Sequence, residues 1–319
     1  MRAYIVLGGP SPGSNAGPQA IRDAMKTYLV APTKQSRTGS EASDLGSAGR
    51  GAKGLRLRIL LSYFYFRDFD LDHLVDDIFD GAAEVDIFVD SGAYSAATGG
   101  GSINPNDYIE WVRKWQHRLT IASAPDVIGD PVATERDTKL MLKAGLKVPT
   151  LPVYHVGEPW PLLERIAKEH GYIALGGMVP YSKNGKFLRA WCTKAFKFIP
   201  RTTHVHGFGM TNWTMMQAFP WYSVDSSSWT SGVRYGQFQL FERGRMIEVD
   251  MRNRTQLLKQ SDLLRRYGLT ARGTVSRGSG FDRDAIIRAN LLSWSAAEDW
   301  MNDEQSKVKS ARPQSLQSR

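Results

Sequence analysis

The chain has 319 residues, of which 42% are hydrophobic and 23% are charged, and this balance excludes wholesale disorder. Its formal net charge of +9 suits a polyanionic partner, although a basic protein without such a partner has the same balance. The single cysteine, Cys192, excludes an intramolecular disulfide and a zinc site built from several cysteines. No stretch is long and apolar enough to cross a bilayer, so we expect no membrane contact and a cytoplasmic location, in the host cytoplasm if a phage encodes the chain.

Residues 1–54 are predicted to hold a short strand and a flexible insertion. The strand covers residues 2–7, and a helical patch covers residues 19–30. Residues 33–54 are rich in Gly, Ser, Pro and Ala and have too few apolar side chains for a core, which predicts a mobile loop.

Strands and helices alternate from residue 55 onward. Apolar, β-branched and aromatic runs predict the strands, and amphipathic spacing predicts the helices. The strands are expected at 57–66, 84–90, 126–130, 150–155, 172–177, 203–209 and 221–225, and the helices at 69–81, 105–118, 132–144, 160–169, 186–198 and 214–218. Near-continuous apolar strands separated by helices are typical of parallel βαβ units. We therefore predict an α/β fold in which residues 55–232 form a (β/α)8 TIM-type barrel.

The pattern changes after residue 232. Two strands are predicted at 237–242 and 246–249 around a tight turn, followed by helices at 255–267 and 283–301. We expect residues 233–301 to form a basic C-terminal extension that completes the barrel. Residues 302–319 are polar and are expected to be a disordered tail.

Carboxylates, histidines and glycine turns follow the predicted strands, at the ends where barrel enzymes carry their chemistry. Asp90 ends the second strand and Asp225 ends the seventh. Two carboxylates at strand ends make a candidate pair of nucleophile and general acid/base. The other candidates at this rim are Asp126, Asp130, Tyr154, His155, Gly176, Gly177, Met178, His206, Gly207, Phe208 and Gly209.

Each of these residues also has a purely structural explanation. Asp130 can cap the following helix, Asp90 can cap a turn, and each histidine can be buried for packing alone. The functional interpretation depends on the convergence of these side chains at one rim.

Six motifs at the strand ends resemble those of the tRNA-guanine transglycosylase superfamily. The resemblance is greatest to its DNA-acting branch, the phage and bacterial 7-deazaguanine DNA transglycosylases. The motifs are Asp-Ser-Gly-Ala-Tyr at 90–94, Asp-Val-Ile-Gly-Asp at 126–130, Pro-Val-Tyr-His at 152–155, Leu-Gly-Gly-Met at 175–178, His-Gly-Phe-Gly at 206–209 and Val-Asp-Ser-Ser-Ser-Trp at 224–229. Each motif is short, and their order along the chain makes the match specific.

The resemblance implies roles for these residues. Asp225 corresponds to the nucleophile of the family and Asp90 to its general acid/base. Asp130 corresponds to the carboxylate that binds the amide edge of the purine, and His155, or less closely Tyr154, takes the place of a base-binding glutamine. Two glycine turns and three large side chains are the remaining candidates to surround the base: Gly176 and Gly177, Gly207 and Gly209, and Tyr94, Met178 and Phe208.

The activity implied is that of a DNA-guanine transglycosylase, a pentosyltransferase that exchanges guanine in DNA for a 7-deazaguanine base of the preQ0 type. The exchange passes through a covalent intermediate between aspartate and deoxyribose, and the target nucleotide must leave the base stack. This chemistry requires no metal and no other cofactor. The tRNA enzymes carry a zinc site of three Cys and one His, which a chain with only Cys192 cannot build, so DNA is the expected partner. Lys and Arg side chains between 234 and 277 are expected to contact its phosphates.

Three other interpretations stay open at this point. One is a tRNA-guanine transglycosylase that has lost its zinc, and a second is a non-catalytic barrel that binds nucleic acid. The third is a barrel hydrolase that uses Asp90 and Asp225 on a glycoside.

Overall fold

The chain forms an α/β fold around one large sheet, most of whose strands run parallel. The structure is a computed structural model and describes residues 2–5, 26–30, 48–98, 101–226, 235–275 and 282–310. Along the sheet the strands follow the order β6-β5-β4-β3-β1-β2-β10-β9-β8-β7. Their bounds are β1 (Arg2–Ile5), β2 (Lys26–Val30), β3 (Arg56–Ser62), β4 (Glu84–Asp90), β5 (Ile121–Ser123), β6 (Thr150–Leu151), β7 (Val153–His155), β8 (Tyr172–Gly176), β9 (His204–Gly207) and β10 (Ser223–Ser226).

The two strands at the ends of this order, β6 and β7, are consecutive in the chain and only Pro152 separates them. Strand β6 pairs with β5 and β7 pairs with β8, in both cases in parallel. Strand β2 pairs in parallel with both β3 and β10, whereas β1 is antiparallel to β2 and β3.

Helices follow most of the strands, and several begin at a side-chain cap. Asn104, Asp130, Asn184 and Asn212 each accept a backbone N–H of the helix that follows, which satisfies one of its free donors. The helices are α3 (Tyr63–Phe66), α4 (Leu71–His73), the π-helical turn η1 (Leu74–Ile78), α5 (Ala93–Thr98), α6 (Pro105–Trp115), α7 (Pro131–Lys143), α8 (Trp160–Glu169), the 3-10 turn η2 (Val179–Tyr181), α9 (Gly185–Phe198) and α10 (Trp213–Ala218).

Both faces of the main sheet are buried, as is typical of parallel sheets covered by helices. Alternate residues of one strand enter different clusters, since successive side chains point to opposite faces. Leu60 of β3 and Phe88 of β4 belong to a small inner cluster, while their neighbours Leu61 and Val89 pack in the large cluster that includes the helices.

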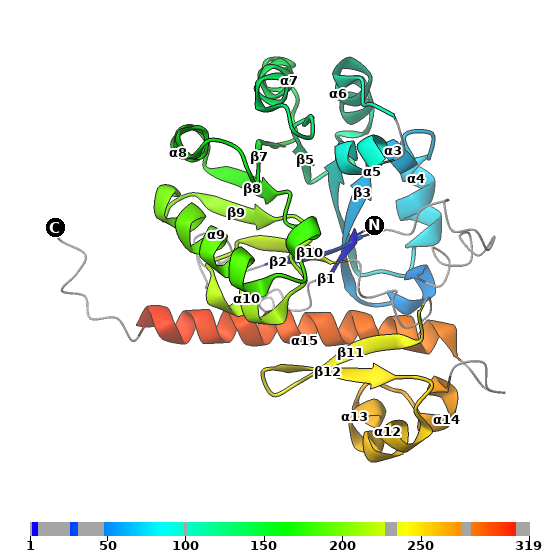
Figure 1. Ribbon diagram of the computed structural model, residues 1–319. Coiled ribbons are helices and arrows are strands. Elements are labelled where there is room, and N and C mark those ends of the chain that lie inside the picture. The colour runs from blue at the N-terminus through cyan, green and yellow to red at the C-terminus, as the bar shows by residue number, and fades with distance from the viewer. Residues whose placement is uncertain are drawn as a thin grey trace.

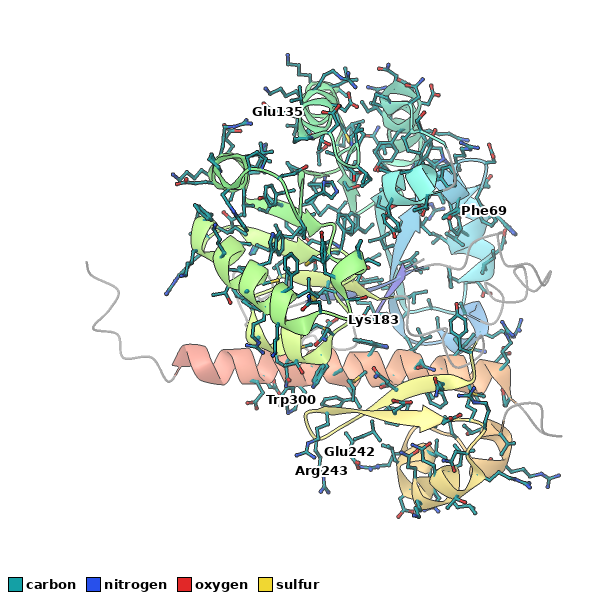
Figure 2. The ribbon with its side chains drawn as sticks, viewed as in Figure 1. Phe69, Glu135, Lys183, Glu242, Arg243 and Trp300 are labelled. Atoms are coloured by element: carbon teal, nitrogen blue, oxygen red, sulfur yellow. The ribbon has the colours of Figure 1, made fainter. Side chains whose placement is uncertain are left out.

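The C-terminal part of the chain packs on the main sheet through one long helix. The hairpin of β11 (Gln237–Glu242) and β12 (Arg245–Asp250) forms a sheet of its own. In Figure 1, α15 (Arg283–Ser310) runs between the main sheet and this hairpin, with the short helices α12 (Arg254–Lys259), α13 (Ser261–Arg266) and α14 (Ala271–Thr274) beside the hairpin. Trp300 of α15 contacts the rings of Trp213 and Phe241 close to the hairpin turn (Figure 2).

Several predicted elements are corrected by the structure. Residues 26–30 form β2 and not the end of a helix, because pairing with β10 and β3 outweighs local helical spacing. The strand expected at 57–66 ends at Ser62, and the one expected at 126–130 lies at 121–123. Helix α15 continues to Ser310, past the point where we expected a disordered tail.

The C-terminal extension does not add a strand to the main sheet within the described residues. The strand between β10 and β3 comes instead from the N-terminal region, as β2. Most of the loop predicted at 33–54 lies outside the described residues. The part that the structure describes begins at residue 48 with a helical turn. None of the described helices combines the length and the apolar character needed to cross a membrane.

Candidate active site

A cavity of about 310 Å³ lies at the carboxyl ends of the parallel strands. Its lining includes the last residue of each of five strands, because parallel strands bring their carboxyl ends to one edge of the sheet. These residues are Ser62 of β3, Asp90 of β4, Ser123 of β5, His155 of β7 and Gly176 of β8. The volume is at the lower end of the range for small-molecule sites, which suits one small ligand.

The carboxylate of Asp126 in the cavity has a polar partner at each oxygen. Ser91 Oγ donates to Asp126 Oδ1 at 2.7 Å, and His155 Nε2 lies 3.0 Å from Asp126 Oδ2. On the other side of the imidazole, His155 Nδ1 lies 3.3 Å from Glu158 Oε1. The backbone N–H of His155 also donates to Glu158 Oε2, at 3.0 Å. Asp126 is thus held by one donor on each oxygen, and His155 is held by two carboxylates.

These contacts set the charge of His155. Burial lowers the pKa of His155, but the hydrogen bonds and negative charges of Asp126 and Glu158 outweigh burial and raise the pKa to about 9. A protonated imidazole donates from both ring nitrogens, so His155 fixes the orientation of Asp126.

Two glycines allow close packing around the cavity, Gly176 beside His155 and Gly92 beside Ser62. A Cβ on Gly176 would lie 2.9 Å from His155 Cδ2 and 3.2 Å from its Nε2. Gly92 has a φ of +77°, and a Cβ there would lie 2.3 Å from Ser62 Oγ. Ser62 Oγ is itself buried and has no hydrogen-bond partner among the described residues, at a position that lines the cavity.

Asp225, the predicted nucleophile, is not among the described residues that line the cavity. It is fully buried. The backbone N–H of Gly209 donates to both carboxylate oxygens, at 2.8 and 2.9 Å, and His206 Nε2 lies 3.2 Å from Oδ1. Phe208, the neighbour of Gly209, does line the cavity. The turn that binds Asp225 therefore borders the cavity through Phe208.

The structure brings about half of the predicted site residues together. The lining contains Asp90, Tyr94, His155, Gly176, Gly177 and Phe208.

Five other predicted residues have structural positions instead. Asp130 is exposed and caps α7 by accepting the N–H groups of Val132 and Ala133, so the helix start uses its carboxylate. Tyr154 points away from the cavity: its hydroxyl donates to Glu158 O at 2.7 Å, and its ring stacks on that of Trp191. The remaining three do not line the cavity either, since Met178 is buried in the large core, Gly207 packs against Trp221 and Gly209 binds Asp225.

Two features of the site differ from the sequence-based prediction: its serines, and the position of its second carboxylate. Ser62 and Ser123 line the cavity as the last, polar residues of apolar strands, and that change in polarity was the available signal. Asp126 takes the position in the cavity that we expected for Asp130, because the strand ends earlier than predicted. Glu158 acts through His155, which follows from its place three residues after it in a tight turn.

Comparison with protein-family models finds none that matches this chain, and comparison with curated proteins likewise finds no match. Within the part of the chain that the structure describes, no group of three or more His, Cys, Asp and Glu side chains is arranged to hold a metal ion. Function is therefore inferred from the cavity and its side chains.

Proposed function

We propose that the main sheet closes into a (β/α)8 barrel. The strand pairings support closure, because β6 and β7 are one strand interrupted at Pro152 and they join β5 to β8. Strand β2 makes the second junction, between β10 and β3. In such a barrel the cavity lies at the carboxyl-end face, where barrel enzymes place their active sites.

We further propose that the chain is a DNA-guanine transglycosylase, which exchanges guanine in DNA for a 7-deazaguanine base. The observation that carries this proposal is the cavity in which Asp90, Asp126 and His155 converge beside the Gly176–Gly177 turn. Its size suits a single purine, and its aromatic and glycine lining suits a flat one.

Asp126 is the proposed recognition group for guanine. Guanine presents two adjacent donors, its N1–H and its exocyclic amine, whereas adenine presents an acceptor at N1. A carboxylate accepts about four hydrogen bonds, so Asp126 can bind both donors while it keeps those from Ser91 and His155. This role replaces the one expected for Asp130.

Asp90 and Asp225 are the proposed acid/base and nucleophile. Asp225 attacks C1′ of the target deoxyribose, so that a C1′–O bond forms and the C1′–N9 bond to guanine breaks. Asp90 gives its proton to the departing guanine and later takes the N9 proton of the incoming 7-deazaguanine. That N9 then attacks C1′, and the electron pair of the C1′–O bond returns to Asp225.

This mechanism requires the turn at 207–209 to move. The backbone N–H of Gly209 donates to both oxygens of Asp225, and Phe208, its neighbour in the same turn, lines the cavity. Entry of the nucleotide into the cavity is the proposed trigger, because displacement of Phe208 would take Gly209 with it.

The test is incubation of the protein with DNA and a labelled 7-deazaguanine, followed by mass spectrometry of the nucleosides. We expect label in DNA with the wild type and neither exchange nor a trapped adduct with Asp225→Asn. Asp126→Asn presents a donor to the guanine donors, so exchange should fall by about 100-fold or more. The matched control is Asp130→Asn, which alters only an exposed helix cap and should keep wild-type exchange.

Other outcomes select other functions. Incorporation into tRNA and not DNA would favour the transglycosylase that lacks zinc. Guanine binding that depends on Asp126, without any exchange, would favour a non-catalytic base-binding barrel. Wild-type exchange by Asp225→Asn would remove Asp225 from the mechanism.

A further inference from the structure

The mouth of the cavity is apolar and exposed, in contrast to its polar interior. Four large apolar side chains in the lining are exposed: Tyr94 by 47%, Ile128 by 44%, Val179 by 41% and Tyr181 by 38%. Exposed apolar groups gathered at one place mark a surface that a ligand or partner covers. The cavity has room for one small ligand, so we expect a second group to cover the exposed parts of these side chains.

Tyr181 is held by a ring contact and by backbone hydrogen bonds. Its ring packs against Phe187 of α9, with 4.4 Å between the ring centroids and an angle of 31° between the planes. Its backbone N–H donates to Met178 O at 3.0 Å, and its carbonyl accepts from Asn184 N at 2.8 Å. One side of the ring is thus braced by the protein, and the ring still reaches the cavity mouth.

Two lysines follow Tyr181 in the chain, Lys183 in the loop and Lys186 in the first turn of α9. Lys183, labelled in Figure 2, and Lys186 are both exposed, and neither makes an ion pair with any residue that the structure describes. Proteins that bind single-stranded nucleic acid combine aromatic rings, on which bases stack, with exposed cations that neutralise the phosphates.

We propose that Tyr181 is a stacking platform for the base next to the target nucleotide in single-stranded DNA, with Lys183 and Lys186 on the adjoining phosphates. The assignment rests on the proposed function in one respect, since the target base itself occupies the cavity. A flipped nucleotide leaves its neighbour without a stacking partner on one side, and the tyrosine ring supplies that partner. Ile128 and Val179 complete the apolar mouth.

The test uses oligodeoxynucleotides with one guanine and the fluorescent base 2-aminopurine beside it. With the wild type we expect tight binding and quenching of 2-aminopurine on one side of the guanine. Tyr181→Ala should weaken binding by on the order of 10-fold and abolish the quenching, whereas Tyr181→Phe should keep both.

An oligonucleotide with an abasic neighbour should bind the wild type and Tyr181→Ala equally. Tyr235→Ala, which changes an exposed tyrosine outside the cavity lining, is the matched control and should bind as the wild type does.

The lysines are tested by salt dependence. Lys183→Gln should reduce the slope of log affinity against log salt by about 0.7, the value for one phosphate of a single strand. An unchanged slope would remove Lys183 from the surface.

Two further results keep stacking separate from folding and from chemistry. Tyr181→Leu retains apolar bulk, so loss of quenching in that variant with an unchanged melting temperature supports stacking. Wild-type affinity and quenching in Tyr181→Ala would overturn the platform, even where exchange occurs. Quenching that depends on Tyr181 in a protein without exchange would overturn the proposed chemistry and leave the platform standing.

Discussion

The protonation of His155 makes the stability of the protein depend on pH. Its pKa is raised to about 9 because Asp126 and Glu158 outweigh the effect of burial, whereas an unfolded chain has a histidine pKa near 6.5. A group whose folded pKa is raised stabilises the protein fully below the unfolded pKa and loses that contribution as pH rises through the folded one. We therefore expect the free energy of unfolding of the wild type to exceed that of His155→Gln by a constant amount below about pH 6.5. The difference should shrink between there and pH 9.

Urea denaturation of both proteins from pH 6 to pH 10 measures this difference. His170 is a suitable control, since burial lowers its pKa and Glu169 only partly opposes that effect. For His170→Gln the sign is reversed: the wild type should gain its advantage above pH 6.5 and lose it on acidification. A difference for His155→Gln that does not vary with pH would show that His155 is not charged in the folded protein.

At the scale of elements, the end of β8 holds His155 against Asp126. Gly176 packs so closely on His155 that an added Cβ would meet its ring, whereas Gly171, before the same strand, has no atom within 4 Å of such a Cβ. We expect Gly176→Ala to push His155 away from Asp126 and to lower guanine affinity by about 10-fold, the effect of losing one good hydrogen bond to a charged group. Gly171→Ala should bind guanine as the wild type does.

Imidazole resonances in NMR spectra check the cause as well as the effect. If His155 loses Asp126, its pKa should fall from about 9 toward 6.5 in Gly176→Ala and stay unchanged in Gly171→Ala. Loss of guanine affinity with an unchanged His155 pKa would mean that Gly176 acts on the ligand directly.

The strands also explain why the site could be predicted only in part. Residues 84–90 form β4 with the predicted bounds, because a continuous apolar run ends at Asp90 and Gly92 forces a turn. Strand β5 has three residues, too few for a periodic pattern, so local sequence predicts the strand at 126–130 and favours Asp130 over Asp126. The cap formed by Asp130 is one of the two explanations that the sequence leaves open, and the hydrogen bonds to Val132 and Ala133 decide for it.

The whole molecule depends on contacts between distant parts of the chain that no local pattern encodes. Residues 26–30 were expected to be helical, but β10 and β3 both pair with them as a strand. The C-terminal extension was expected to complete the barrel, whereas its hairpin forms a separate sheet and α15 connects the two parts. The predicted elements were thus largely correct, and the partners of the terminal ones were not.

One buried ion pair joins these parts of the molecule. Arg58 of β3 lies 3.1 Å from Asp86 of β4 and 3.3 Å from Glu298 of α15, and the side chains of Arg58 and Glu298 are almost wholly buried. Removal of one partner of a buried pair leaves the other charge without compensation in a poorly solvated place. We expect Arg58→Ala to lower the free energy of unfolding by about 3–5 kcal/mol, measured by urea denaturation. Arg56, two residues earlier, pairs with Glu84 at the surface. Arg56→Ala should therefore change the free energy of unfolding by only about 0–1 kcal/mol. Equal losses in the two variants would mean that the attachment of α15 does not depend on this pair.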